Sequence, residues 1–171
     1  MKTQKTQTTL HDAFLDELRD AFDAEKQVLT ALPRMIKAAT SSKLKSAFES
    51  HLTETKRQVE RLEKAFASLD IAAKGKHCDG MAGILKEAAS VMAEDHDEMT
   101  MDACLIAAAQ RVEHYEMAAY GTLVAWSRVV GNQTVTDLLQ DTLLEEKHAD
   151  LKLSAMAEAG INQDAASAVP A

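Results

Sequence analysis

Turn-forming and aromatic residues are scarce in this sequence. It has six Gly and two Pro among its 171 residues, and aromatic residues make up 4% of it. Because Gly and Pro mark most turns, their scarcity leaves few turn signals, and the abundant Ala, Leu, Glu, Lys and Met favour helix nearly everywhere. With so few aromatic side chains, the core must consist mainly of Ala, Leu, Val and Met.

Cysteine and long apolar runs are equally scarce. The two cysteines, Cys78 and Cys104, lie in different segments without CxxC spacing, which argues against a disulfide framework or a zinc knuckle. No stretch approaches the ~18 apolar residues of a membrane span, and the N-terminal MKTQKTQTTL lacks the apolar run of a signal peptide. We therefore expect a cytoplasmic protein without a membrane partner.

Basic residues are in the minority. Nineteen Lys and Arg against 27 Asp and Glu give a net charge of -8, which repels phosphate backbones and anionic membrane surfaces. This balance argues against nucleic acid as a partner. The length of 171 residues suits a single domain with a sizeable core.

Four long segments repeat apolar residues at three- and four-residue steps, the spacing of amphipathic helices. The first follows Thr9 as N-cap, and Pro33 near its end predicts a kink or a frayed end rather than a break. Ser41 or Ser42 starts the second. The four helices are expected over about residues 10–39, 42–69, 99–130 and 134–158.

The last two helices carry terminal signals of their own. Gly131 is well placed as a C-terminal cap for the third helix, and Thr134 with Asp137 resembles a capping box for the fourth. After Gly160 the remaining residues have no clear periodicity. We therefore predict a helical domain over residues 9–160 and a flexible tail over residues 161–171.

The second and third helices are roughly 30 residues apart, long enough for the chain to traverse the bundle. This connection contains a short amphipathic segment over about residues 81–94. Two helical hairpins joined by such a crossover are the connectivity of the ferritin-like four-helix bundle. The predicted fold is therefore all-α and ferritin-like, with a short fifth helix in the crossover. Another long-loop bundle topology is the alternative.

The inner stripe of each long helix becomes polar near its middle, where a simple core would stay apolar. Its polar members are Glu25 in the first helix, His51, Glu54 and Gln58 in the second, Glu113 and Glu116 in the third, and Glu145 and His148 in the fourth. Residues three or four apart share one helix face, so every helix contributes at least one inward carboxylate.

These five carboxylates cannot all stay ionised in a dry interior, because each unpaired charge costs several kcal/mol. Protons, basic side chains or metal cations could neutralise them. Few basic residues share these faces and two imidazoles do, so metal is the simplest answer. Oxygen-rich ligation with one or two nitrogens suits iron or manganese rather than structural zinc. We predict two iron ions, with manganese as the alternative.

Several segments together resemble the YciE/YciF family of bacterial ferritin-like stress proteins. They are DAEKQ (23–27), HLTET (51–55), QVERLE (58–63), KHCDGM (76–81), RVEHYEMAAYGTL (111–123) and LLEEKHADLKL (143–153). The resemblance covers about residues 9–160. It implies a bundle that can bind two metal ions, that is often dimeric and that is induced under stress, without an assigned biochemical activity.

The sequence is also similar to rubrerythrin, whose di-iron site reduces peroxide. That resemblance implies a Glu-x-x-Glu pair on the third helix, matched by Glu113 with Glu116, and a Glu-x-x-His pair on the fourth, matched by Glu145 with His148. It also implies Glu-x-x-His on the second helix. There the sequence departs, because Arg57 stands three residues after Glu54.

Two ligand positions therefore stay open. On the second helix either His51 or Gln58 could supply the missing donor, and we prefer His51 because imidazole binds iron better than a carboxamide. On the fourth helix either Glu145 or Glu146 could ligate, with Asp150 supporting the ligands.

The leading functional hypothesis is a non-haem di-iron protein acting on a small oxidant, peroxide or dioxygen. Glu54 and Glu116 are expected to bridge the two ions. The expected terminal ligands are Glu25, His51, Glu113, Glu145 and His148. The alternative is a homodimeric structural or interaction protein without catalytic turnover, and iron storage is a third hypothesis.

Overall fold

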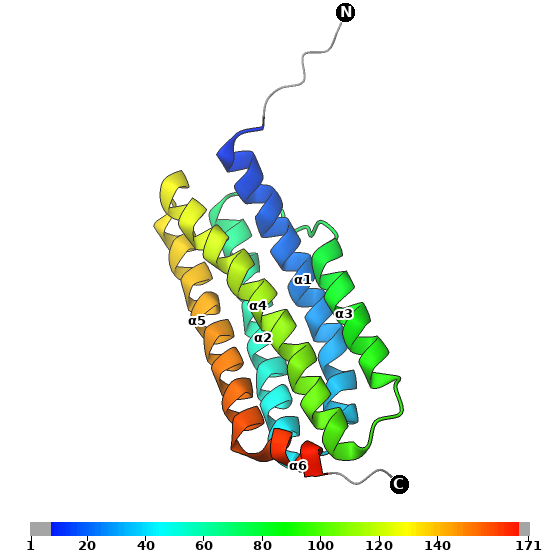
Figure 1. Cartoon of the computed structure of the whole chain (residues 1–171). Coiled ribbons are helices and arrows are strands. Elements are labelled where there is room, and N and C mark those ends of the chain that lie inside the picture. Colours follow the sequence, from blue (N-terminus) through cyan, green and yellow to red (C-terminus); the bar gives the residue numbers. More distant parts are fainter. Residues whose placement is uncertain (1–7, 168–171) are drawn as a thin grey trace, which may run out of the picture.

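The structure, a computed structural model, describes residues 8–167 and is helical throughout, with no strand among these residues. The α-helices are α1 (Leu10–Ala38), α2 (Ser42–Ser68), α3 (Asp79–Met92), α4 (Glu98–Val130), α5 (Gln133–Met156) and α6 (Asn162–Ser167), with a π-helical segment, η1 (Ala157–Ile161), between the last two (Figure 1). The predicted all-α class is confirmed, and the four long helices lie close to their expected bounds.

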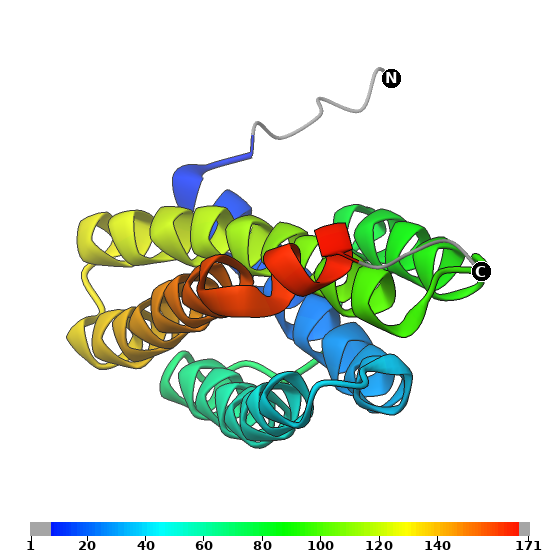
Figure 2. The same cartoon turned by 60° about the horizontal axis from the view of Figure 1, so that its bottom comes forward.

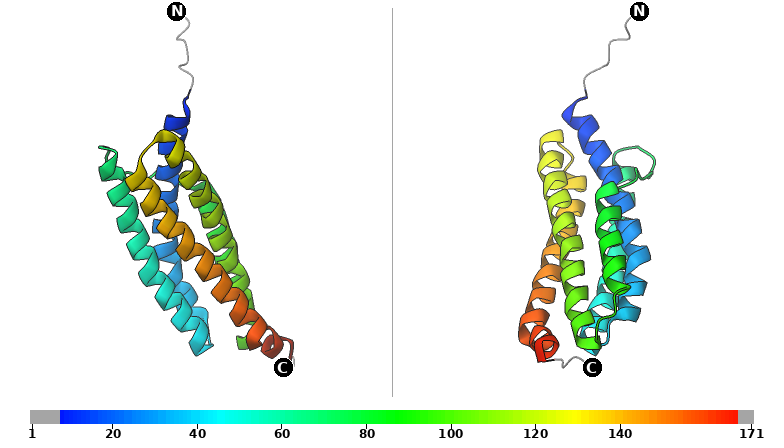
Figure 3. Two further views of the ribbon diagram at one scale, coloured as in Figure 1. Left: turned by 90° about the vertical axis from the view of Figure 1, so that its left-hand side faces the viewer. Right: turned by 45° about the vertical axis from the view of Figure 1, so that its right-hand side comes forward.

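The long helices α1, α2, α5 and α4 form a four-helix bundle in which each packs against the next and α4 closes the ring on α1 (Figure 3). The short α3 lies outside this ring, against α1 and α4. It runs back along the bundle, so that α2 and α4 run in the same direction (Figure 1). This is the predicted ferritin-like connectivity of two hairpins joined by a crossover with a short helix.

A capping box begins the first long helix, and a glycine in the left-handed conformation ends the third. The Thr9 hydroxyl accepts from the Asp12 N–H at 3.2 Å, and the Asp12 carboxylate accepts from the Thr9 N–H at 2.9 Å, which completes a capping box. Gly131 ends α4 with a φ of 87°, a left-handed conformation that glycine adopts without a Cβ clash.

Helix α5 begins at Gln133, close to the predicted start, but the predicted capping residues are wrong. Asn132, not Thr134, caps α5: its side-chain carbonyl accepts from the Val135 N–H at 3.0 Å. Thr134 lies inside the helix, and Asp137 instead accepts from the Gln133 amide at 2.7 Å. Asparagine is at least as good an N-cap as threonine. Because Asn132 directly follows Gly131, the end of α4, it caps α5 before the chain reaches Thr134.

The C-terminal ends of α1 and α5 can also be compared with the predictions. Helix α1 continues through Pro33 to Ala38, so the proline does not break it, as expected. Past α5 the chain bends at Gly160, whose φ of 163° and ψ of -37° are not helical, and α6 then packs against α4 at the end of the bundle (Figure 2). Residues 162–167, which were expected to belong to a flexible tail, are therefore helical; residues 168–171 lie outside the described part of the chain.

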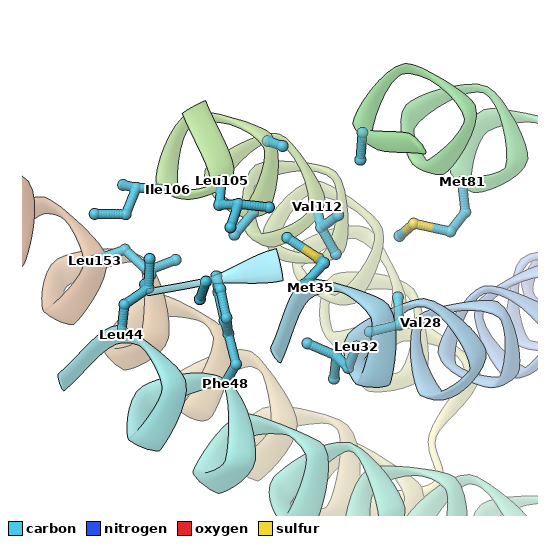
Figure 4. Packing of buried hydrophobic residues seen from close by; sticks show 14 of the residues in the cluster. Val28, Leu32, Met35, Leu44, Phe48, Met81, Leu105, Ile106, Val112 and Leu153 are labelled. Carbon is cyan, nitrogen blue, oxygen red and sulfur yellow. The ribbon is translucent and has the colours of Figure 1, made fainter. Parts of the chain in front are cut away.

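The buried apolar residues form two groups along the bundle axis. One group lies toward the α1–α2 turn, where Leu32 and Met35 of α1 approach Val112 of α4, and Leu44 and Phe48 of α2 point toward α4 (Figure 4). The other group lies toward the opposite end and is built from residues such as Phe14, Leu18, Leu62, Phe66 and Leu123. Among the described residues, no helix is both long enough and apolar enough to cross a membrane.

Candidate metal centre

A layer of buried polar side chains separates the two apolar groups of the core. Its members are Glu25 of α1, His51, Thr55 and Gln58 of α2, Glu113 and Glu116 of α4, and Thr142 and Glu146 of α5. Each continues the inward stripe of its own helix, so the same periodicity that buries the leucines turns these groups inward. All four long helices therefore contribute polar groups to the interior, as predicted.

Four of these side chains come close enough to share an ion. One ligand atom from each of His51, Glu113, Glu116 and Glu146 lies within 4.8 Å of those of the other three. The α4 pair meets here because residues three apart lie on one helix face. The His51 Nε2 atom lies 3.3 Å from Glu113 Oε1. Three carboxylates with one imidazole form a donor set suited to iron or manganese.

Hydrogen bonds orient two of the buried carboxylates. The Tyr120 hydroxyl of α4 donates to Glu25 Oε1, across the bundle on α1. The Gln58 amide donates to Glu146 Oε1 and, at 3.1 Å, to Glu145 Oε2. Each of these bonds engages one oxygen of the buried carboxylate, which leaves the second oxygen of Glu25 and of Glu146 facing the layer without a partner.

Unpartnered polar atoms are concentrated in this layer. Among residues 8–167, the side-chain atoms buried without a hydrogen bond are Glu25 Oε2, His51 Nδ1 and Nε2, Gln58 Oε1, Glu113 Oε2, Glu116 Oε1 and Glu146 Oε2. All belong to the polar layer, whereas buried polar groups in folded proteins are nearly always paired. Each unpaired group costs ~1–3 kcal/mol. Bound cations would satisfy them together, so the residues present fit a metal site.

The buried carboxyl groups favour protons when no cation is near. Burial, and then the charge of neighbouring carboxylates, raises the pKa values of Glu25, Glu113 and Glu116 well above the ordinary 4.5. Burial also raises the pKa of Glu146. Four carboxyls this close cannot all ionise in a low-dielectric interior, so protons or metal cations must neutralise them.

Glu145 lies outside the cluster. Its carboxylate is held by the Arg61 guanidinium through two hydrogen bonds of 2.6 and 2.7 Å, and Arg57 lies 3.9 Å away. The neighbouring residue Glu146 is fully buried in the layer instead. Of the two alternatives on this helix, Glu146 is thus the one that the fold brings to the other carboxylates.

Glu54 and His148 border the cluster without entering it. Glu54 is half-buried, with Oε2 3.9 Å from His51 Nδ1 and Oε1 4.0 Å from Arg57. The nearby His51, followed by the Arg57 charge, lowers its pKa below the ordinary value. His148 is exposed. Both line a cavity of about 100 Å³ that reaches His51 and Glu113, so they lie at its opening.

The sequence held a signal for Glu146 that the predicted ligand set did not use. Leu139, Glu146 and Leu153 are seven residues apart and all buried, which defines the inward stripe of α5. The steps from Leu138 to Thr142 and Glu145 define a neighbouring stripe, and the predicted ligand Glu145 lies on that stripe, one position from Glu146. Tyr120 is a buried core residue that also supplies the hydrogen bond to Glu25.

Residues 9–166 match the sequence profile of a family described as "Domain of unknown function (DUF892)". The chain belongs to the DUF892 family. Its sequence is 40% identical over 158 residues to Protein YciF of Escherichia coli (strain K12), which covers 92% of this chain and 95% of YciF. The predicted resemblance to the YciE/YciF proteins is thereby confirmed.

Solved structures of similar proteins share the fold of this DUF892 protein. The crystal structure of the E. coli stress protein YciF superposes with a TM-score of 0.87 at 39% identity, covering 91% of this chain and 99% of that one. YcfI from Rhodopseudomonas palustris superposes with a TM-score of 0.85 at 41% identity, covering 90% and 98%. The ferritin-like architecture is therefore shared across nearly the whole length of these proteins.

Proposed function

We propose that this protein binds a pair of transition-metal ions in the polar layer, iron in preference to manganese, and uses them in redox chemistry on peroxide or dioxygen. The observation that carries this proposal is the convergence of unpartnered buried carboxylate and imidazole atoms from four helices. Iron, when bound, would supply one-electron redox chemistry toward such an oxidant.

The proposed ligands are Glu25, His51, Glu113, Glu116 and Glu146. Tyr120 and Gln58 would act through two of them, because a hydrogen bond to one oxygen of a ligating carboxylate fixes the direction of the other. The apolar groups above and below would exclude bulk water. Glu54 and His148, at the cavity opening, stay predicted ligands, whereas Glu145 would first have to leave Arg61.

The biological setting follows from similarity. YciF of E. coli is described as a stress protein, and we propose that this chain also acts in a cytoplasmic stress response. The carboxylate layer would then handle an oxidant that accumulates under stress. Cells that lack the protein should be more sensitive to peroxide, and complementation with the wild-type chain should restore resistance.

The direct test is metal analysis combined with an anaerobic iron titration. Protein purified from iron-supplied cells should carry iron, and the metal-free form should take up Fe(II) to a pair of ions per chain. Peroxide added afterwards should produce the near-ultraviolet absorption of ferric iron. Uptake below about a tenth of an ion per chain would contradict a metal-dependent function.

A second function, a structural homodimer without turnover, is favoured by an apolar stripe on the outside of α5. Leu144 and Leu151, seven residues apart, are 55% and 67% exposed. Large exposed leucines in one row are a common feature of protein interfaces. If this function is the relevant one, Leu151→Lys should abolish both the dimer, seen by gel filtration, and cellular protection. Glu116→Gln should leave protection intact.

A further inference from the structure

Two cavities of different polarity meet at His51 and Glu113. One is the opening of about 100 Å³ described above, where Glu54, His148 and Lys152 provide charged and polar walls between α2 and α5. The other lies on the opposite side of these two residues and has room for about 10 Å³. His51 and Glu113 line both, so this pair forms the partition between them.

The small cavity is apolar apart from that partition. Its other walls come from α1, α3 and α4 and include Val28, Leu32, Met35 and Val112. Figure 4 shows these side chains converging between α1 and α4. A space this small holds about one water-sized particle, and an apolar space of this kind favours small apolar molecules over water.

A larger groove lies directly outside the small cavity, between α1 and α3. It has a volume of about 340 Å³. Ala31, Met35 and Leu85 line both spaces, so these side chains lie between the groove and the cavity. Met35 is the most flexible of the three, because methionine has several rotatable bonds and no branching.

We propose that this groove is the access route of dioxygen to the polar layer, with Met35 as its movable gate. The inference rests on the proposed metal-dependent function and assigns a substrate to one face of that site. The groove has Lys26, Gln27, Thr30 and Arg34 along its α1 wall and an apolar wall of Leu85, Ala88, Ala89 and Met92 on α3, and it leads to the apolar cavity beside His51 and Glu113. Dioxygen is small and apolar and needs no hydrogen-bond partners in such a space, whereas hydrated cations and peroxide need the polar side chains of the opening between α2 and α5.

The first experiment uses dissolved dioxygen itself as a paramagnetic probe in nuclear magnetic resonance. The full-length protein, freed of metal by a chelator, is equilibrated with nitrogen or with pressurised oxygen. Methyl groups of Val28, Met35 and Val112 should relax several-fold faster under oxygen than equally buried methyls of Leu18 and Leu123 in the other part of the core. Equal enhancement in both groups would overturn the route.

The second experiment closes the groove. Ala31→Phe places a large side chain between groove and cavity, whereas Ala107→Phe makes the same change at an exposed position of α4 outside both spaces. Ala31→Phe should remove most of the oxygen-induced relaxation at Val112, and Ala107→Phe should leave it as in the wild type. An unchanged enhancement in Ala31→Phe would also overturn the route.

Failure of the route and failure of the metal function give different results. The relaxation measurements need no metal, and the anaerobic Fe(II) titration needs no dioxygen. In the iron-loaded protein, Ala31→Phe should slow oxidation by dioxygen several-fold and leave oxidation by peroxide unchanged. Equal slowing by both oxidants would contradict separate access, even if iron binds as proposed.

Discussion

Arg61 of α2 binds Glu145 of α5 through both terminal guanidinium nitrogens, at 2.6 and 2.7 Å. This pair lies at the edge of the bundle and gives Glu145 a positive partner within the chain. Glu146, the next residue, is buried and has an oxygen without any partner. Two adjacent glutamates thus have opposite electrostatic environments, one neutralised by arginine and the other available to a cation.

Removing the charge of each of these two glutamates should affect metal binding differently. Glu146→Gln should weaken Fe(II) binding by at least about 10–100-fold, the usual cost of disturbing even an outer partner of a metal ligand. Glu145→Gln removes the same charge one residue away and should change affinity little. Anaerobic isothermal titration measures both. Equal losses of Fe(II) affinity in the two variants would show that the burial of Glu146 does not decide which glutamate binds the metal.

Metal should stabilise the fold. A ligand at about 100 times its Kd that binds only the folded state adds ~2.7 kcal/mol to the free energy of unfolding. For a chain of this size that corresponds to a rise in Tm of about 5–10 °C. Differential scanning calorimetry measures this rise as the difference in Tm between protein with Mn(II), which avoids oxidation, and chelator-treated protein. An unchanged Tm at saturating metal would speak against the site.

The metal-free protein should lose stability as the pH rises. The pKa values of Glu25, Glu113, Glu116 and Glu146 are raised in the folded state, so folding retains protons that the unfolded chain releases. Their contribution is present below the ordinary pKa of 4.5 and is lost as the pH rises through the folded-state values. Tm in chelator should therefore fall from pH 5 toward pH 8.

Two observations would check that interpretation of the pH dependence. Glu54 acts in the opposite sense, because its lowered pKa gives stability that is lost only as the pH falls below about 4.5. Saturating Mn(II) should reverse the slope above pH 5, since metal binds the deprotonated ligands. A metal-free Tm that rises toward pH 8 would mean that these carboxyls are not the dominant titrating groups.

Tyr120→Phe should destabilise the metal-free protein by about 1–3 kcal/mol. The variant removes the hydroxyl that donates to Glu25 and leaves a buried carboxyl oxygen unpaired. Tyr115→Phe is the matched control, because its hydroxyl bonds Cys78 and Asp20 in a partly exposed setting and should cost less. Urea unfolding measures both. A Tyr115 variant that is the less stable of the two would contradict the prediction.

Two glycines of α3 should respond oppositely to alanine. A Cβ at Gly80 would lie 2.7 Å from the Tyr115 ring, so Gly80→Ala should cost about 1–3 kcal/mol as the ring is displaced. A Cβ at Gly83 meets no atom within 4 Å, so Gly83→Ala should stabilise by about 0.5–1 kcal/mol through helix propensity. Thermal unfolding distinguishes them, and equal shifts would argue against the close packing of α3 on Tyr115.

Local sequence patterns were sufficient to predict the helices and the polar interior of the bundle. Periodicity and capping are local properties, which is why α1, α2 and α4 lie within a few residues of their predicted bounds. The inward positions of Glu25, His51, Glu113 and Glu116 also followed from periodicity, because each continues a stripe of core residues on its own helix.

Which of the two adjacent glutamates of α5 faces the layer, and how far Glu54 of α2 reaches it, depends on how the helices pack against one another. Neighbouring residues on a helix differ by about 100°, so Glu145 and Glu146 both border the inward stripe, and the choice depends on how α5 is rotated against α2 and on the position of Arg61. Glu54 is half-exposed, and two cavities meet at His51. Both features arise from packing between helices, which the sequence of a single helix does not encode.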